Sequence, residues 1–150
     1  LWQEIRVNRG MGYSIYSYHE TYVDDGQFGI YAGTSPENLP DMVPIMLAEI
    51  VKMRDGVTPQ EVQRAKNQMI SGLRMGREKV MTRAEQQGRY VLSYGTPLDP
   101  MVLIDKINAV TAQGVQDLAH VIFDSPLLVS AIGPLSPLMS VDDMKKALRA

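Results

Sequence analysis

The stretch RVNRGMGYSIYS, residues 6–17, places side chains that could do chemistry around two glycines. Arg6 comes seven residues before Tyr13, and Arg9 lies between them. A guanidinium and a phenol both donate hydrogen bonds to oxygen atoms that carry negative charge. Because glycines allow sharp backbone turns at low steric cost, the GMG segment is expected to bring Arg6 and Tyr13 close together at the edge of a sheet.

Metal chemistry has little support within the sequence. His19 and His120 are the only histidines, there is no cysteine, and the two histidines lie about a hundred residues apart. HETYV starts like the H-E-x-x-H zinc helix, but its fifth residue is Val23 and it sits in a strand pattern. HVIFD does not fit the inverted H-x-x-E-H motif either. We therefore expect no metal site in this chain and interpret both histidines as surface or interface residues.

Other common site motifs are missing too. The sequence has no G-x-S-x-G turn for a serine nucleophile. GMGYSIYSY follows a helix and leads into a strand, which is the reverse of the context of a phosphate-binding G-x-G-x-x-G loop.

Composition excludes several kinds of partner. The 15 Lys and Arg are scattered among 17 Asp and Glu, for a net charge of −2, so there is no basic patch for nucleic acid or anionic lipid. No apolar run approaches the roughly 20 residues of a membrane span, and the first residues do not resemble a signal peptide. The sequence thus predicts neither a nucleic-acid nor a membrane partner, while the lack of cysteine fits reducing and oxidising compartments alike.

The elements that position Arg6 and Tyr13 are predicted to be a short helix and a β-hairpin. The helix ends at Gly10, the first strand runs from Gly12 to Tyr22, VDDGQ offers an Asp-Gly turn, and FGIYAG follows as the second strand. Further along the chain we expect helices over residues 39–54, from Pro59 after a Thr58/Glu61 capping box, over 82–93, from Asp99, after Thr111 and from Ser140, and a third strand at PLLVSAIG, residues 126–133.

This order predicts an α+β fold in which an antiparallel sheet is packed on one side by helices. Three strands are few for so many helices, so unpaired edges should accept strands from sequence outside this chain or from a partner. The chain also opens on Leu1, inside a helical pattern without a capping residue. We therefore expect residues 1–150 to be one domain that is incomplete at its N-terminus, a fragment of a longer protein.

Several segments together carry a resemblance to a known family. The first is the N-terminal stretch LWQEIRVNRGMGYSIYSYHETYVDDGQFGIYAGTSPENL. It is followed along the chain by VTPQEVQRAKNQM, YVLSYGTPLD, INAVTAQGVQDLA and, near the C-terminus, IGPL. In this order they resemble the C-terminal domain of the pitrilysin and insulinase family of zinc peptidases. The likeness is greatest to the mitochondrial processing peptidase branch and its bacterial relatives.

The resemblance implies a function for the chain. In that family an N-terminal domain holds the zinc and the general base, and an inactive C-terminal domain closes over the peptide substrate. An arginine and a tyrosine seven residues apart reach into the site, which here correspond to Arg6 and Tyr13. They would stabilise the substrate carbonyl and the negative charge of the transition state, while Arg9 is interpreted as a surface charge. Extended substrates commonly pair as an added strand, for which the edge at Phe28, Gly29, Ile30 and Tyr31 is the candidate.

Three hypotheses follow. The first is a substrate-clamping domain of a zinc metalloendopeptidase whose zinc lies in an N-terminal domain or a partner subunit, this chain alone being inactive. The second is a non-catalytic homologous subunit, either a partner or a relative of the core proteins of the respiratory bc1 complex. The third is an unrelated interaction module. The first predicts a bacterial cytoplasmic protein, or alternatively one of the mitochondrial matrix, and a homo-oligomer when the chain is isolated.

Overall fold

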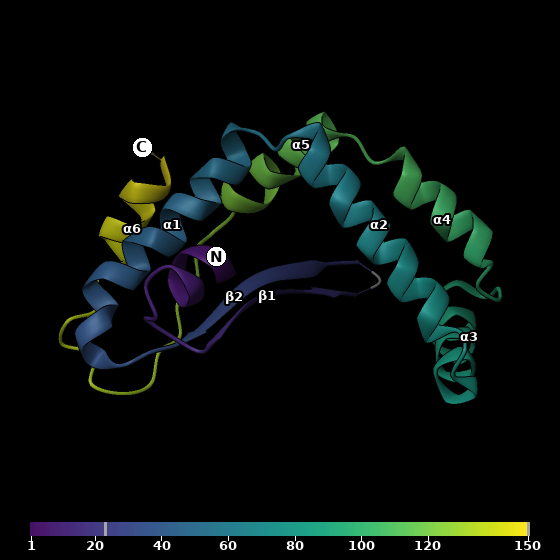
Figure 1. The fold of residues 1–150 in the computed structure, drawn as a ribbon, viewed down its shortest axis with the longest axis horizontal. Helices are drawn as coiled ribbons and strands as arrows, with labels where there is room; N and C mark the ends of the chain where they lie inside the picture. The colour runs from purple at the N-terminus through teal and green to yellow at the C-terminus, as the bar shows by residue number, and fades with distance from the viewer. Residues whose placement is uncertain (23, 150) are drawn as a thin grey trace. The chain divides into compact units, whose positions relative to one another are not determined.

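The computed structural model describes residues 1–22 and 24–149, which form two compact units. The first unit comprises residues 1–55 and 116–149, and the second comprises residues 56–115. In chain order the elements are η1 (Trp2–Val7), β1 (Ser14–Thr21), β2 (Gly26–Gly33), η2 (Pro36–Asn38), α1 (Leu39–Asp55), α2 (Pro59–Gly76), α3 (Val80–Tyr94), α4 (Pro100–Ala109), α5 (Ala112–Phe123) and α6 (Val141–Arg149) (Figure 1).

The predicted hairpin is confirmed in the first unit. β1 and β2 pair antiparallel in a register that runs from Ser14 opposite Gly33 to Thr21 opposite Gly26. Because side chains alternate along a strand, one face of the hairpin is apolar and packs toward α1, and the other carries Tyr16 and Tyr31 with stacked rings 5.1 Å apart. Part of the predicted turn falls on Val23, which lies outside the described residues. The α+β class, with helices on one side of an antiparallel sheet, is likewise confirmed.

Two apolar clusters give the first unit its core, and α1 contributes to both. One cluster joins η1, β1 and α1 through Ile5, Ile15 and Met42, and Ile5 is completely buried. The other cluster joins α1 to α6, which lie side by side, through Val43, Leu47, Met144 and Leu148 (Figure 1). Since α1 is common to the two clusters, it fixes η1 and the start of β1 to the rest of the unit.

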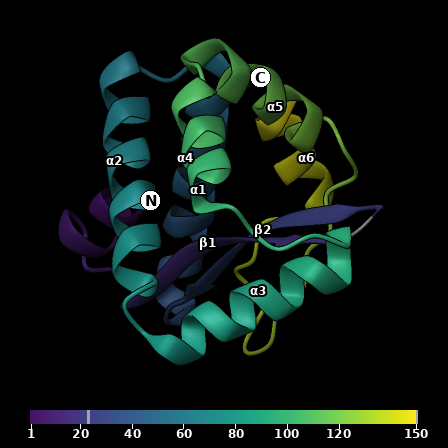
Figure 2. The same ribbon diagram turned by 90° about the vertical axis from the view of Figure 1, so that its right-hand side faces the viewer.

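The second unit is made of helices whose ends are set by local sequence. Thr58 and Glu61 form the predicted capping box at the start of α2, each side chain bonding the other's backbone N–H. Asp99 caps α4 by accepting a 2.8 Å bond from the N–H of Met101. α2 and α4 lie side by side, as Figure 2 shows.

The third predicted strand is wrong. Residues 126–133 have no regular secondary structure, and Leu128 and Ile132 are 92% and 101% exposed. A strand gains its stability from hydrogen bonds to a neighbour, and the two described strands pair only with each other. Residues 128–133 of the segment instead line a cavity of about 720 Å³ together with β2 residues 29–33.

No helix in the described part of the chain is long and apolar enough to cross a membrane.

Candidate functional site

The turn between η1 and β1 depends on both glycines of the GMG segment. Gly10 has a φ of 63°, in the left-handed region that glycine adopts without strain. A Cβ at Gly12 would lie only 2.5 Å from the backbone oxygen of Gly33. The chain therefore leaves η1 through a left-handed residue and then passes close against the end of β2, which accounts for both glycines.

This turn brings Arg6 and Tyr13 together. One guanidinium nitrogen of Arg6, Nη1, donates a 3.2 Å hydrogen bond to the backbone oxygen of Tyr13, and the guanidinium carbon lies 5.7 Å from the centre of the Tyr13 ring. The Tyr13 side chain is 79% exposed, so its hydroxyl is available to a ligand. The two side chains thus present adjacent donors at the point where β1 begins.

A third residue, Trp2, belongs to the same cluster and was not identified from the sequence. The Arg6 guanidinium carbon lies 4.1 Å from the centre of the Trp2 indole ring, a distance typical of cation–π contacts. Trp2 precedes Arg6 by four residues in a helical turn. That i, i+4 spacing was the available signal, because it places two side chains on one helical face.

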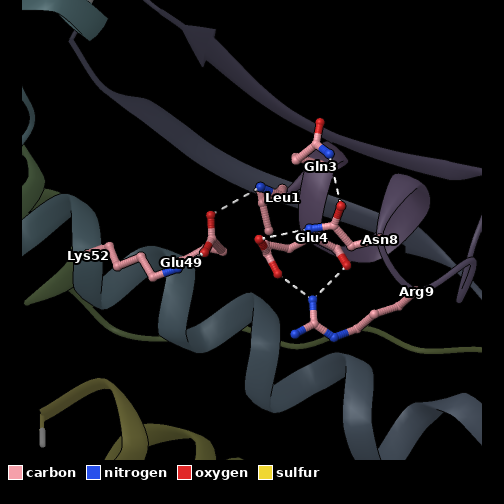
Figure 3. Close-up of polar contacts among 7 residues, drawn as sticks. All are labelled: Leu1, Gln3, Glu4, Asn8, Arg9, Glu49 and Lys52. Atoms are coloured by element: carbon pink, nitrogen blue, oxygen red, sulfur yellow. Dashed lines mark hydrogen bonds and ion pairs between the residues drawn. The ribbon is translucent and has the colours of Figure 1, made fainter.

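Arg9 has a different environment from Arg6. Its guanidinium pairs with the Glu4 carboxylate and also donates a 2.9 Å hydrogen bond to the Glu4 backbone oxygen (Figure 3). The hydrogen bond from Arg9 holds the pKa of the Glu4 carboxyl below its usual value. Within the described residues Arg6 has no carboxylate within ion-pair distance. Of the two arginines in this segment, only Arg6 thus keeps an unneutralised charge.

The pairing of Arg9 with Glu4 follows from the type of helix. η1 is a single turn of π-helix, in which the N–H of Asn8 bonds the carbonyl of Gln3 five residues earlier. Residues five apart then share a face. The Gln3 side chain therefore donates a hydrogen bond to the Asn8 side chain, and the Glu4 carboxylate pairs with the Arg9 guanidinium (Figure 3).

The predicted substrate-binding strand lies farther along the hairpin. Phe28 and Ile30 point to the face lined by α1, and Phe28 packs edge-on against Phe123 at 5.5 Å. Gly29 is covered by the Tyr18 ring, since a Cβ there would lie 2.3 Å from it. The hairpin pairing begins at Ser14, which lies opposite Gly33. Gly29 is four residues along β2 from Gly33, a distance of about 13 Å. Phe28 and Gly29 therefore lie away from Arg6 and Tyr13, whereas the Tyr31 hydroxyl reaches toward Gly33, which is opposite the start of β1.

The residues of β2 line two cavities, both free of charged side chains. The cavity of about 720 Å³ is lined by residues 29–33 and 128–135, and a second of about 290 Å³ lies toward α1. Lining groups are apolar side chains, hydroxyls and main chain. An uncharged, extended segment fits this chemistry better than a charged one.

The described residues do not suit a zinc ion. They contain no group of three or more His, Asp or Glu side chains arranged to hold a metal. His19 lies in β1 and His120 in α5, both exposed. A structural or catalytic zinc needs three or four such ligands, and the described residues do not bring that many together.

Comparison with known proteins shows similarity to one family of peptidases. Residues 1–69 match the family model of the Peptidase M16 inactive domain. An uncharacterized zinc protease of Rickettsia felis is 35% identical over 134 residues, covering 89% of this chain and 32% of the relative. The uncharacterized zinc protease YmxG of Bacillus subtilis is 30% identical, covering 89% and 33%. The predicted resemblance to the pitrilysin family of zinc peptidases is therefore confirmed.

The comparisons also bear on the branch and the fold. A probable mitochondrial-processing peptidase subunit beta of Arabidopsis thaliana is 31% identical over 147 residues, covering 97% of this chain and 28% of the relative. A chain in a structure of Complex III2 from Candida albicans with Inz-5 bound has the same fold, with a TM-score of 0.84 at 20% identity over 96% of this chain and 35% of its own length. The chain spans about a third of the length of the curated relatives it matches.

Proposed function

We propose that this chain is the inactive, substrate-clamping domain of a zinc metalloendopeptidase, and that Arg6 and Tyr13 contact the substrate. The observation that carries the proposal is the difference between the two neighbouring arginines. Arg9 is neutralised by Glu4, whereas Arg6 is held by a backbone oxygen and aromatic rings and keeps its charge. A charged guanidinium without a carboxylate partner is suited to a carbonyl oxygen that gains negative charge.

In this proposal the two donors act together. The guanidinium of Arg6 and the phenol of Tyr13 donate hydrogen bonds to the scissile carbonyl or to the adjacent substrate backbone. These bonds strengthen as the tetrahedral transition state forms, because the oxygen then becomes an anion. Neither residue activates water. Zinc held by an N-terminal domain or a partner subunit would supply that chemistry, in agreement with the zinc-protease names of the relatives.

The edge of β2 is proposed to hold the rest of the substrate. Phe28, Gly29, Ile30 and Tyr31 offer main-chain groups beside the two uncharged cavities, Phe28 at the smaller one and Gly29 to Tyr31 at the larger. An extended peptide adds to such an edge by backbone hydrogen bonds. The spacing of about 13 Å between Gly29 and the end of the ladder at the start of β1 corresponds to about four residues of extended chain. One peptide could therefore occupy the edge and reach Arg6.

The test uses the full-length protein that contains this chain and a peptide substrate. Arg6→Ala and Tyr13→Phe should each lower kcat on the order of a hundredfold, the usual cost of one transition-state donor, with zinc content unchanged. Arg9→Ala is the matched control and should keep nearly full activity. If Arg9→Ala were as damaging as Arg6→Ala, or if the Arg6 variant changed only KM, the proposed role would be wrong.

The same experiment addresses the alternative, a non-catalytic homologous subunit. Such a protein would contain no stoichiometric zinc and would cleave no peptide on its own, and activity would depend on adding a zinc-bearing partner. The bacterial relatives and the mitochondrial relative from a plant support a cytoplasmic protein of a bacterium or, alternatively, one of the mitochondrial matrix.

A further inference from the structure

We propose that Trp2 is a positioning residue for Arg6: its indole ring holds the guanidinium in place without neutralising its charge. This inference rests on the proposed function, because it deepens the role given to Arg6. Its geometric basis, the 4.1 Å between the Arg6 guanidinium carbon and the ring centre, is independent of any assumption about the substrate.

Arg6 needs such support because its other contacts leave it free to move. The structure gives the guanidinium one hydrogen bond, from Nη1 to the backbone oxygen of Tyr13, although the group carries five N–H donors. Apart from Trp2, its only other contact is the Tyr13 ring at the longer distance of 5.7 Å, so the side chain would keep much of its rotamer freedom without the indole. A flat ring against the guanidinium restricts it beforehand.

The choice of partner matters for charge. A carboxylate would hold Arg6 more strongly but would also neutralise it, as Glu4 does for Arg9. Glu4, the acid in η1, is already engaged by Arg9 and by the side chain of Asn8 (Figure 3). An indole instead attracts the cation through its ring electrons and leaves the N–H groups at the guanidinium edge available. The arrangement therefore orients Arg6 and preserves its donors.

Packing in the core does not explain the position of Trp2. Its side chain is 51% exposed, and it lies outside the buried cluster of Ile5, Ile15 and Met42 that anchors η1. An aromatic ring with half its surface in water contributes less to a core than a buried one. The charged group that stacks on its ring is the guanidinium of Arg6.

The contact can be measured directly, because Trp2 is the only tryptophan among the 150 residues. A stacked guanidinium covers one of the two faces of the indole. Arg6→Ala should therefore raise the acrylamide quenching constant of the chain's tryptophan fluorescence by about twofold, and Arg9→Ala should leave it unchanged, all three chains being measured at a dilution at which light scattering shows a monomer. Equal quenching in wild-type and Arg6→Ala chains would overturn the inference, whatever the protease assay shows.

The functional arm uses the full-length protein and compares Trp2→Leu with Trp2→Tyr. Leucine keeps apolar bulk but has no ring electrons, while tyrosine retains a cation–π face. We expect Trp2→Leu to lower kcat about two- to fivefold with little change in KM, and Trp2→Tyr to restore most of that loss. In an Arg6→Ala background, Trp2→Leu should have no further effect, because the ring then has nothing to position.

The outcomes separate the two proposals. If Arg6→Ala leaves the activity intact, the proposed function fails. If Arg6→Ala impairs the enzyme but Trp2→Leu does not, or if Trp2→Leu and Trp2→Tyr are equally damaging, only the positioning role is wrong.

Discussion

Replacing Ile5 by alanine tests whether η1 is anchored as the structure places it. Ile5 is the one described large side chain that is completely buried, and it contacts the cluster shared by β1 and α1. Ile→Ala in a core costs about 2–5 kcal/mol, from lost apolar burial and the cavity left behind. Met11 and Met46 lie around the cluster and are flexible enough to fill part of that space. We therefore expect the lower part of the range, about 2–3 kcal/mol.

Urea denaturation of the 150-residue chain measures this loss. With a slope of about 2 kcal/mol per molar urea, the midpoint should fall by about 1–1.5 M, or the variant should already be unfolded in buffer. Ile132→Ala is the matched control, since it makes the same chemical change at a side chain that is 101% exposed. Its effect should stay within about 0.5 kcal/mol. If the two variants lost equal stability, the reasoning that Ile5 anchors η1 in a core would be refuted.

Three further predictions concern other parts of the chain. Thr58→Ala should destabilise the second unit by about 1 kcal/mol through loss of the capping box, whereas Thr58→Ser should not, as urea denaturation would show. The pKa of Glu4 is lowered by Arg9, so their contact is present at neutral pH and is lost as the pH falls through that lowered pKa; an NMR titration of Arg9→Ala should return the Glu4 pKa toward 4.5. The isolated chain should form a dimer or higher oligomer through residues 1–33, because the hairpin has unpaired edges, and light scattering of a clean monomer at tens of micromolar would contradict this.

Local sequence signals predicted the parts of the fold that depend on local interactions. The Thr58/Glu61 box fixed the start of α2, and Asp99 did the same for α4, because caps act within three residues. The hairpin was equally accessible, since its strands follow one another and alternate in polarity. None of these elements needs a distant partner to be recognised.

The segment 126–133 shows where such reasoning stops. Its apolar residues have strand propensity, but a strand exists only when another strand pairs with it. In the described residues no strand does so, and the segment and the edge of β2 line the same uncharged cavity. Strand propensity correctly identified residues 126–133 as apolar and suited to a strand. It could not indicate whether another strand lies beside them to pair with.

In the candidate site, too, some features could be predicted from the sequence and others required the structure. The spacing of Arg6 and Tyr13 could be found in the sequence through a family resemblance, and the two glycines between them indicated a turn. The pairing of Arg9 with Glu4 could not, because it depends on η1 being a π-turn. In an α-helix, Glu4 would face the residue four positions on, which is Asn8, whereas the wider turn also brings Arg9 to it. The type of one helical turn thus bears on whether Arg9 reaches Glu4, while Arg6, only two residues after Glu4, lies on another side of the turn beside Trp2 and Tyr13.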